Sequence, residues 1–142
     1  MTDTFNLDRF LQAQRETYVT ALAELKAGRK ASHWIWFIFP QLSGLGRSPT
    51  AQHYAITSLE EAKAYLDHPV LGPRLHECLS ALQSSASTSA EQIFGALDAM
   101  KFRSSLTLFR AAEPADAVIS TALERWFGGR EDDATLKLLR HA

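Results

Sequence analysis

The sequence predicts an all-α protein: an irregular, compact, multi-helix single domain that spans residues 1–142. Apolar residues recur at helical spacing in most segments, and helix-capping and helix-ending residues separate these segments. Only one run is rich in aromatic and β-branched side chains. Because an isolated strand has no neighbour with which to pair, this single run does not predict a sheet.

The first helix is the clearest. Asn6 is expected to cap it and Gly28 to end it. Between them, apolar residues follow helical spacing at Leu7, Phe10, Leu11, Tyr18, Leu22 and Leu25. The run Trp34–Phe39 comes next, and its composition alone favours a strand. Since no partner strand follows, we expect a short buried helix or an extended segment that Pro40 ends.

Capping residues predict the remaining helices. Ser48-Pro49 places serine at the cap and proline at the first helical position, and Ser58-x-x-Glu61 is a capping-box pattern. The adjacent acidic pairs Glu60-Glu61 and Asp132-Asp133 lie at helix starts, where carboxylates interact favourably with the helix dipole and no catalytic role is expected. The predicted helices cover residues 49–56 and 59–66, a segment from Gly72-Pro73, residues 90–97 after Ser89, a segment after Glu113-Pro114 that runs through Ala117 to Phe127, and a last short helix capped by Asp132 or Asp133.

Composition limits the classes of function. With 142 residues, 46% of them hydrophobic and 22% charged, the chain is large enough for a core and typical of a folded soluble domain. A formal net charge of −1 argues against general nucleic-acid binding and against binding to anionic membranes. The single cysteine, Cys78, excludes an internal disulfide. Without a signal-peptide pattern or a membrane-spanning run, the protein is expected in the cytoplasm.

The loop Gly44-Leu45-Gly46-Arg47-Ser48-Pro49 is the first candidate binding site. Glycines allow backbone amides to converge, and the start of a helix presents unpaired N–H groups to an anion. The guanidinium of Arg47 suits a phosphate or a carboxylate. The spacing matches neither a Walker loop nor a dinucleotide-binding fingerprint. A tight turn that leads into a capped helix is the alternative interpretation.

A second candidate lies in the segment 98–107, where Lys101, Arg103 and Ser104 could bind an anion or a polar substrate. The alternative is a helix with a solvated polar face, on which Asp98 and Lys101 form a pair three residues apart. Arg47 and these two cations form one pocket only if their side chains converge.

Aromatic and imidazole side chains extend the first site. Trp34 and Trp36 could stack on a flat ligand, although core packing is the alternative for both. His53 follows the glycine loop and is the candidate catalytic residue, as a general base or a stacking group. No metal site and no cofactor are expected, because the histidines lack ligand spacing: His33, His53, His68, His76 and His141.

Several segments resemble a bacterial family of helical domains of unknown function, some members of which carry the label calpastatin. The resemblance rests on His33–Gln41, Gly44-Leu45-Gly46, Tyr54-Ala55-Ile56, Glu61-Ala62, Tyr65-Leu66, His68–Gly72, Lys101 with Ser104–Phe109, and the tail from Gly129 to Leu139. It covers nearly the whole chain. It implies an α-helical single domain and supplies no catalytic residues.

A second, local resemblance involves Pro49-Thr50-Ala51-Gln52-His53-Tyr54. This segment is similar to a helix opening in N-glycosidases that act on riboflavin-pathway intermediates and ADP-ribose-type compounds. Gln52 stands where those enzymes have an acid. The resemblance implies a phosphate-bearing, nucleotide-like or ribosyl ligand, and a hydrolase that cleaves N-glycosidic bonds. The alternative function is a non-enzymatic protein-interaction module, possibly homodimeric, whose apolar helix faces bind a partner.

Overall fold

The helix α7 (Ala96–Ala112) runs through the centre of the computed structural model, which describes residues 3–140. His141 lies outside the described residues. Around α7 lie α1 (Asp8–Ala27), α2 (Ile35–Ile38), α3 (Pro49–His53), α4 (Leu59–Asp67), α5 (Leu71–Gln83), α6 (Ala90–Phe94), α8 (Ala117–Phe127) and α9 (Asp133–Arg140). Within residues 3–140 the only β-type pairing is an isolated bridge between Leu42 and Ile56, so the all-α prediction is confirmed.

The central position of α7 follows from its composition. Its residues from Ser104 to Phe109 are all buried, and a helix that is buried on every side must lie inside the fold. The helix itself satisfies two of its hydroxyls, because Ser104 and Thr107 each donate a hydrogen bond to the carbonyl four residues earlier.

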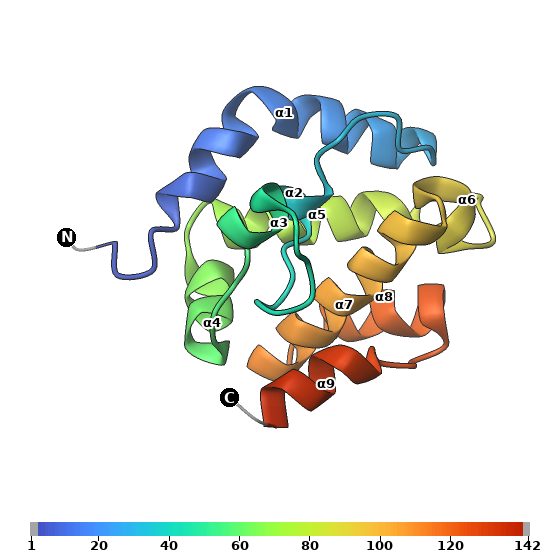
Figure 1. The fold of residues 1–142 in the computed structure, drawn as a ribbon. Helices are drawn as coiled ribbons and strands as arrows, with labels where there is room; N and C mark the ends of the chain where they lie inside the picture. Colours follow the sequence, from blue (N-terminus) through green and yellow to red (C-terminus); the bar gives the residue numbers. More distant parts are fainter. Residues whose placement is uncertain (1–2, 141–142) are drawn as a thin grey trace.

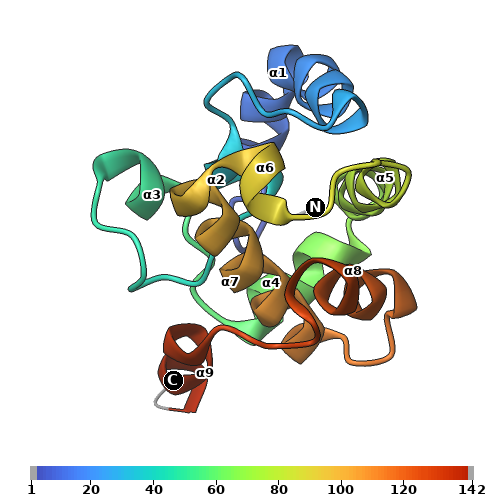
Figure 2. The ribbon, with the colours of Figure 1, turned by 90° about the vertical axis from the view of Figure 1, so that its right-hand side faces the viewer.

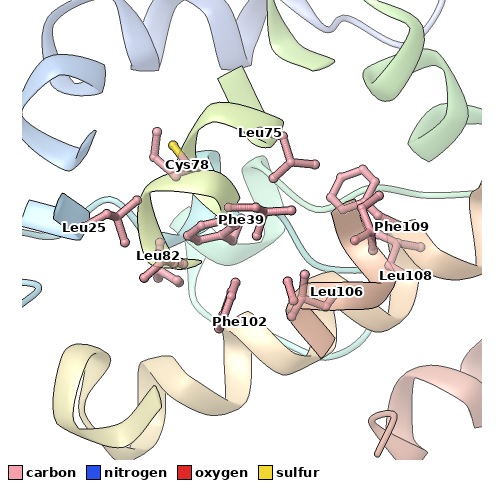
Figure 3. Packing of buried hydrophobic residues seen from close by; sticks show 14 of the residues in the cluster. Leu25, Phe39, Leu75, Cys78, Leu82, Phe102, Leu106, Leu108 and Phe109 are labelled. Atoms are coloured by element: carbon pink, nitrogen blue, oxygen red, sulfur yellow. The ribbon is translucent and has the colours of Figure 1, made fainter. Parts of the chain in front are cut away.

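Aromatic rings pack where α7 meets its neighbours. The ring of Phe102 lies 4.7 Å from that of Phe39 and 4.8 Å from that of Phe94, between ring centroids. Figure 3 shows Phe39 between Phe102 of α7 and the side chains that α5 supplies, among them Cys78 and Leu82. The sequence Trp34–Phe39 thus contributes to the core, as its composition predicts.

The remaining helices form two flanks. The long helices α1 and α5 pack against each other, α5 also packs against α8, and α4 lies against both α5 and α7 (Figure 1). On the other side, α3 and the loop before it project away from α5 and α8 (Figure 2). Residues of α2 and α3 line an open hollow.

Most local helix signals are confirmed. Gly28 and Gly128 end α1 and α8. The serines Ser48, Ser58 and Ser89 each accept a hydrogen bond from a backbone N–H in the first turn of the following helix. Asp132 is the residue that caps the last helix, because its carboxylate accepts from the Thr135 N–H at 2.9 Å. The run Trp34–Phe39 contains the short helix α2.

Some predicted boundaries were wrong. Asn6 does not cap α1, because the carboxylate of Asp3 accepts the N–H groups of Leu7 and Asp8 instead. The helix from Pro49 ends at His53, since Ile56 pairs with the loop before it. The helix predicted over 90–97 is divided at Gly95, which adopts a φ of 81° and separates α6 from α7.

Candidate functional site

The candidate site is an open hollow of about 470 Å³ between α2 and α3. Its lining consists of His33, Trp36, Phe37, Pro49, Thr50, His53 and Tyr54. Trp36 and Phe37 of α2 are half-buried, and α3 lies beside α2 in Figure 2. One wall therefore comes from the run 34–39, which also contributes to the core. The other wall, the α3 wall, comes from α3, which follows the glycine loop.

Helical spacing builds the α3 wall. Thr50, His53 and Tyr54 are separated by three and four residues, so they share one side of a helical turn. The imidazole of His53 meets the ring of Tyr54 edge-on, with 4.6 Å between centroids. Tyr54 in turn packs on Phe37 of α2 at 5.3 Å. These ring contacts hold the two walls together at the base of the hollow.

A lysine side chain lies over the ring of Trp36, beside the hollow. The Nζ atom of Lys101, on α7, lies 5.2 Å from the centroid of the Trp36 ring. The Nζ atom of Lys101 also lies 3.5 Å from a carboxylate oxygen of Asp98. That carboxylate is also shared with Lys30, which lies 2.8 Å from its other oxygen. Lys101 is therefore only partly neutralised, and its positive charge lies against the indole face.

Several polar side-chain groups of the lining have no hydrogen-bond partner in the part of the chain that the structure describes. Among residues 3–140, no hydrogen bond engages the imidazoles of His33 and His53, the hydroxyls of Thr50 and Tyr54, or the indole N–H of Trp36. Donors, acceptors and flat rings thus face the same hollow, which is the usual composition of a small-molecule site.

Arg9 fixes the position of the α3 wall. Its guanidinium donates to the carbonyl of His53 at 2.9 Å and to that of Ala55 at 2.9 Å. It also pairs with the carboxylate of Glu61 at 2.7 Å, where the two side chains are 10% and 2% exposed. Glu61 lies in the first turn of α4, as expected, and the buried pair with Arg9 gives it a second structural role. The pair ties α1 to α4 and to the segment after α3.

The glycine loop has structural reasons for its glycines. Gly44 has a φ of 104°, and a Cβ there would lie 3.3 Å from Leu138 of α9. A Cβ on Gly46 would lie 2.5 Å from that of Ala51, so the loop can approach α3 only with glycine at this position. Ser48 caps α3, and the exposed side chain of Arg47 makes no hydrogen bond within residues 3–140. The side chain of Arg47 remains available to a ligand.

The second predicted segment does not form one pocket. Lys101 and Arg103 are two residues apart on α7, so their side chains leave the helix about 200° apart. Lys101 reaches Trp36, whereas Arg103 donates to the carbonyls of Arg130 and Glu131 at 2.8 and 2.7 Å. Ser104 is buried and bonded within its own helix. Arg103 and Ser104 therefore do not line the α2–α3 hollow.

Trp34 is also placed away from the hollow. Its side chain is fully buried, and its indole N–H donates to the carboxylate of Glu24 at 2.9 Å. Four hydrogen bonds converge on that carboxylate. Burial acts to raise the pKa of Glu24, but these hydrogen bonds outweigh it and lower the pKa to about 2. Glu24 thereby fixes the entry of the chain into α2, and core packing is the role of Trp34.

Sequence reasoning missed part of the site. Thr50 and Tyr54 were not selected, although their helical spacing with His53 was a usable signal. His33 was considered for the same site, with a histidine at the edge of the core as the alternative. No local pattern predicts the contact between Arg9 and Glu61, which are 52 positions apart.

Two further searches concern the residues from 3 to 140. They contain no group of three or more histidine, cysteine, aspartate or glutamate side chains that could hold a metal ion. No helix among them has the length and apolar character needed to cross a membrane.

Comparison with known proteins identifies the family. The model of the family described as "Protein of unknown function (DUF1810)" matches residues 4–139, and the chain belongs to this family. The crystal structure of the conserved hypothetical protein Rv1873 from Mycobacterium tuberculosis is similar to the chain, with 50% sequence identity and a TM-score of 0.94. The match covers 97% of this chain and 99% of that one. A search of curated proteins found no match. The resemblance to a helical family of unknown function is thus confirmed.

Proposed function

We propose that the protein binds a phosphate-bearing, nucleotide-like or ribosyl small molecule in the hollow between α2 and α3. The observation that carries the proposal is the composition of this hollow. It combines the flat rings of Trp36 and Tyr54 with hydrogen-bonding groups that have no partner within residues 3–140. A nucleobase needs a ring on which to stack, and its ribose needs hydrogen-bonding groups nearby.

Cations for the phosphate come from two sides. Lys101 lies against Trp36, and Arg47 precedes the proline that begins the α3 wall. Gly44, Gly46 and Ser48 position Arg47 through the loop contacts described above. Arg47 and Lys101 are the residues that we propose bind the phosphate, because guanidinium and ammonium groups form charge-assisted hydrogen bonds with its oxygens.

A thermal-shift series tests this proposal. The ligands are nucleotides, ADP-ribose, flavin precursors and inorganic phosphate, since a ligand that binds only the native state raises Tm. We expect a concentration-dependent rise that Arg47→Ala and Lys101→Ala reduce. Arg15→Ala is the matched control, because Arg15 is exposed on α1 outside the hollow. A rise that is equal in all three variants would remove Arg47 and Lys101 from the site.

The N-glycosidase resemblance extends the proposal to a reaction. We propose that His53 acts as the general base that accepts a proton from water as the water oxygen attacks the ribosyl carbon. The carbon–nitrogen bond breaks, and the leaving nitrogen keeps the electron pair of that bond and takes up a proton from solvent. Support comes from the position of His53, whose imidazole is exposed in the hollow. Chromatography of ADP-ribose and flavin precursors after incubation tests this step. Release that His53→Ala lowers, with unchanged ligand affinity, is expected, and equal release by both proteins would refute it.

A second candidate function is a protein-interaction module. Leu97 and Met100, one turn apart on α7, are 67% and 63% exposed, which is unusual for large apolar side chains on one helix face. A homodimer would bury them. Light scattering at increasing concentration tests this alternative, since a constant monomer mass excludes the homodimer.

A further inference from the structure

A second hollow lies between α6, α7 and α8, away from the residues that line the α2–α3 hollow. Its volume is about 240 Å³, and Glu91, Met100, Arg103, Trp126 and Arg130 are among the residues that line it. None of these residues lines the first hollow. Such a volume is below that of most drug-sized sites, so it suits a ligand of only a few heavy atoms.

Trp126, one of the lining residues, carries a buried donor without an acceptor in residues 3–140. Trp126 is 8% exposed, and its indole N–H has no hydrogen-bond partner within residues 3–140. Buried indole N–H groups usually have a partner, because a buried donor without an acceptor destabilises the folded state. The equivalent atom of Trp34 has its acceptor in Glu24. An acceptor for Trp126 is the group that this part of the fold does not supply.

Two guanidiniums line the same hollow. Arg103 is held by two hydrogen bonds to the carbonyls of Arg130 and Glu131, which involve Nε and Nη2 and leave Nη1 without an acceptor within the described part of the chain. Arg130 donates from Nε to the carbonyl of Phe127 at 3.3 Å, and its two terminal amino groups likewise have no acceptor there. The guanidinium of Arg103 is therefore held in place by hydrogen bonds to the backbone.

The charges of the lining leave room for an anion. Glu91 is the one carboxylate residue among the lining residues, against two arginines, so the formal charge of the lining is +1. The hollow is rich in N–H donors and poor in acceptors. A ligand that complements it carries several acceptor oxygens and a negative charge.

We propose that this hollow binds a small oxyanion, the carboxylate or phosphate group of a small molecule. The guanidiniums of Arg103 and Arg130 bind its oxygens, and the anion supplies the acceptor that the Trp126 N–H lacks. The site is independent of the α2–α3 hollow, because the two share no residue. Its charge and size, rather than an aromatic ring, determine its ligand.

The three tryptophans allow a direct test in the full chain. The indole N–H signals of Trp34, Trp36 and Trp126 are followed by NMR in ¹⁵N-labelled protein and are assigned with single Trp→Phe variants. Inorganic phosphate and succinate are titrated separately at constant ionic strength, so the two arms distinguish a phosphate from a carboxylate site. We expect a saturable shift of the Trp126 signal and a constant Trp34 signal, because Trp34 is bonded to Glu24.

Variants make the test specific. Arg130→Ala leaves the backbone carbonyl that Arg103 binds, so the fold keeps that contact, and we expect affinity to fall at least tenfold. If Arg130→Ala does not fold, Arg130→Gln is measured in its place. Arg15→Ala, which removes an equal charge from α1, should leave the affinity unchanged. The proposal would be overturned if the Trp126 signal shifted with neither anion, or if the Arg130 variants bound the anion as tightly as the native protein. Because Trp36 reports on the other hollow, failure of one site is distinguishable from failure of the other.

Discussion

Replacing Arg9 with methionine tests how the fold positions the α3 wall. The guanidinium of Arg9 makes five hydrogen bonds, among them those to the carbonyls of His53 and Ala55, and it pairs with the buried carboxylate of Glu61. Methionine preserves most of the apolar stem of arginine but leaves that carboxylate without a cation. We therefore expect both the stability of the protein and the affinity of the hollow to fall.

The structure sets the size of the effect. Glu61 is 2% exposed, and removing one partner of a buried ion pair costs about 3–5 kcal/mol. For a chain of this length, such a loss corresponds to a fall of roughly 10–15 °C in Tm. The Thr57 N–H and hydroxyl still donate to the other oxygen of Glu61, at 2.9 Å each, so the loss should not exceed this range.

Urea unfolding followed by circular dichroism measures the change in the free energy of unfolding. The double variant Arg9→Met with Glu61→Gln removes the unpaired charge, and we expect it to lose less stability than the two single variants together. Arg15→Ala on the same helix is the control for the removal of a surface arginine. A loss below about 1 kcal/mol for Arg9→Met, within the range of exposed ion pairs, would refute the reasoning.

Three other predictions concern stability and reactivity. The pKa of Glu24 is lower in the folded protein than its ordinary 4.5, so the stability that its carboxylate contributes is complete above pH 4.5 and disappears as pH falls towards 2. The free energy of unfolding of Glu24→Gln, measured over the same pH range, should lack this part of the pH dependence of the native protein. Gly72→Ala should destabilise α5 severely in thermal unfolding, because its Cβ would lie 2.1 Å from the carbonyl oxygen of Leu66, while Ser80→Ala on the exposed side of α5 should change Tm little. Burial raises the pKa of the Cys78 thiol to about 12, so a thiol reagent should modify it only after unfolding in urea, and rapid labelling of the native protein would contradict its burial.

Local signals account for the success of the helix predictions. A serine cap or a terminal glycine acts on the nearest turn of the chain, so Ser48, Ser58 and Gly128 could be recognised without knowledge of the fold. The boundary at Gly95 was missed, because α6 and α7 follow each other without a loop and their apolar residues read as continuous. Asn6 was mistaken for a cap because Asp3, earlier in the chain, takes that role.

The candidate site depends on contacts between distant residues, which limited its prediction. Lys101 and Arg103 are near neighbours in sequence but lie on opposite sides of α7, so Lys101 contacts Trp36 beside the α2–α3 hollow whereas Arg103 lines the hollow between α6, α7 and α8. The loop after Pro40 returns α3 to α2, and this return brings His53 towards His33 and Trp36. The sequence predicted the individual residues Trp36, His53 and Lys101, and their common location required the fold.

The most direct measurement of the central proposal is a titration of the ¹⁵N-labelled protein with ADP-ribose, followed at the indole N–H signals. Trp36 lines the α2–α3 hollow, whereas Trp34, two positions earlier in the sequence, is fully buried. The proposal predicts a saturable shift of the Trp36 signal that Arg47→Ala and Lys101→Ala weaken, with no shift of the Trp34 signal. A Trp36 signal that stays constant with ADP-ribose, nucleotides and flavin precursors would contradict it.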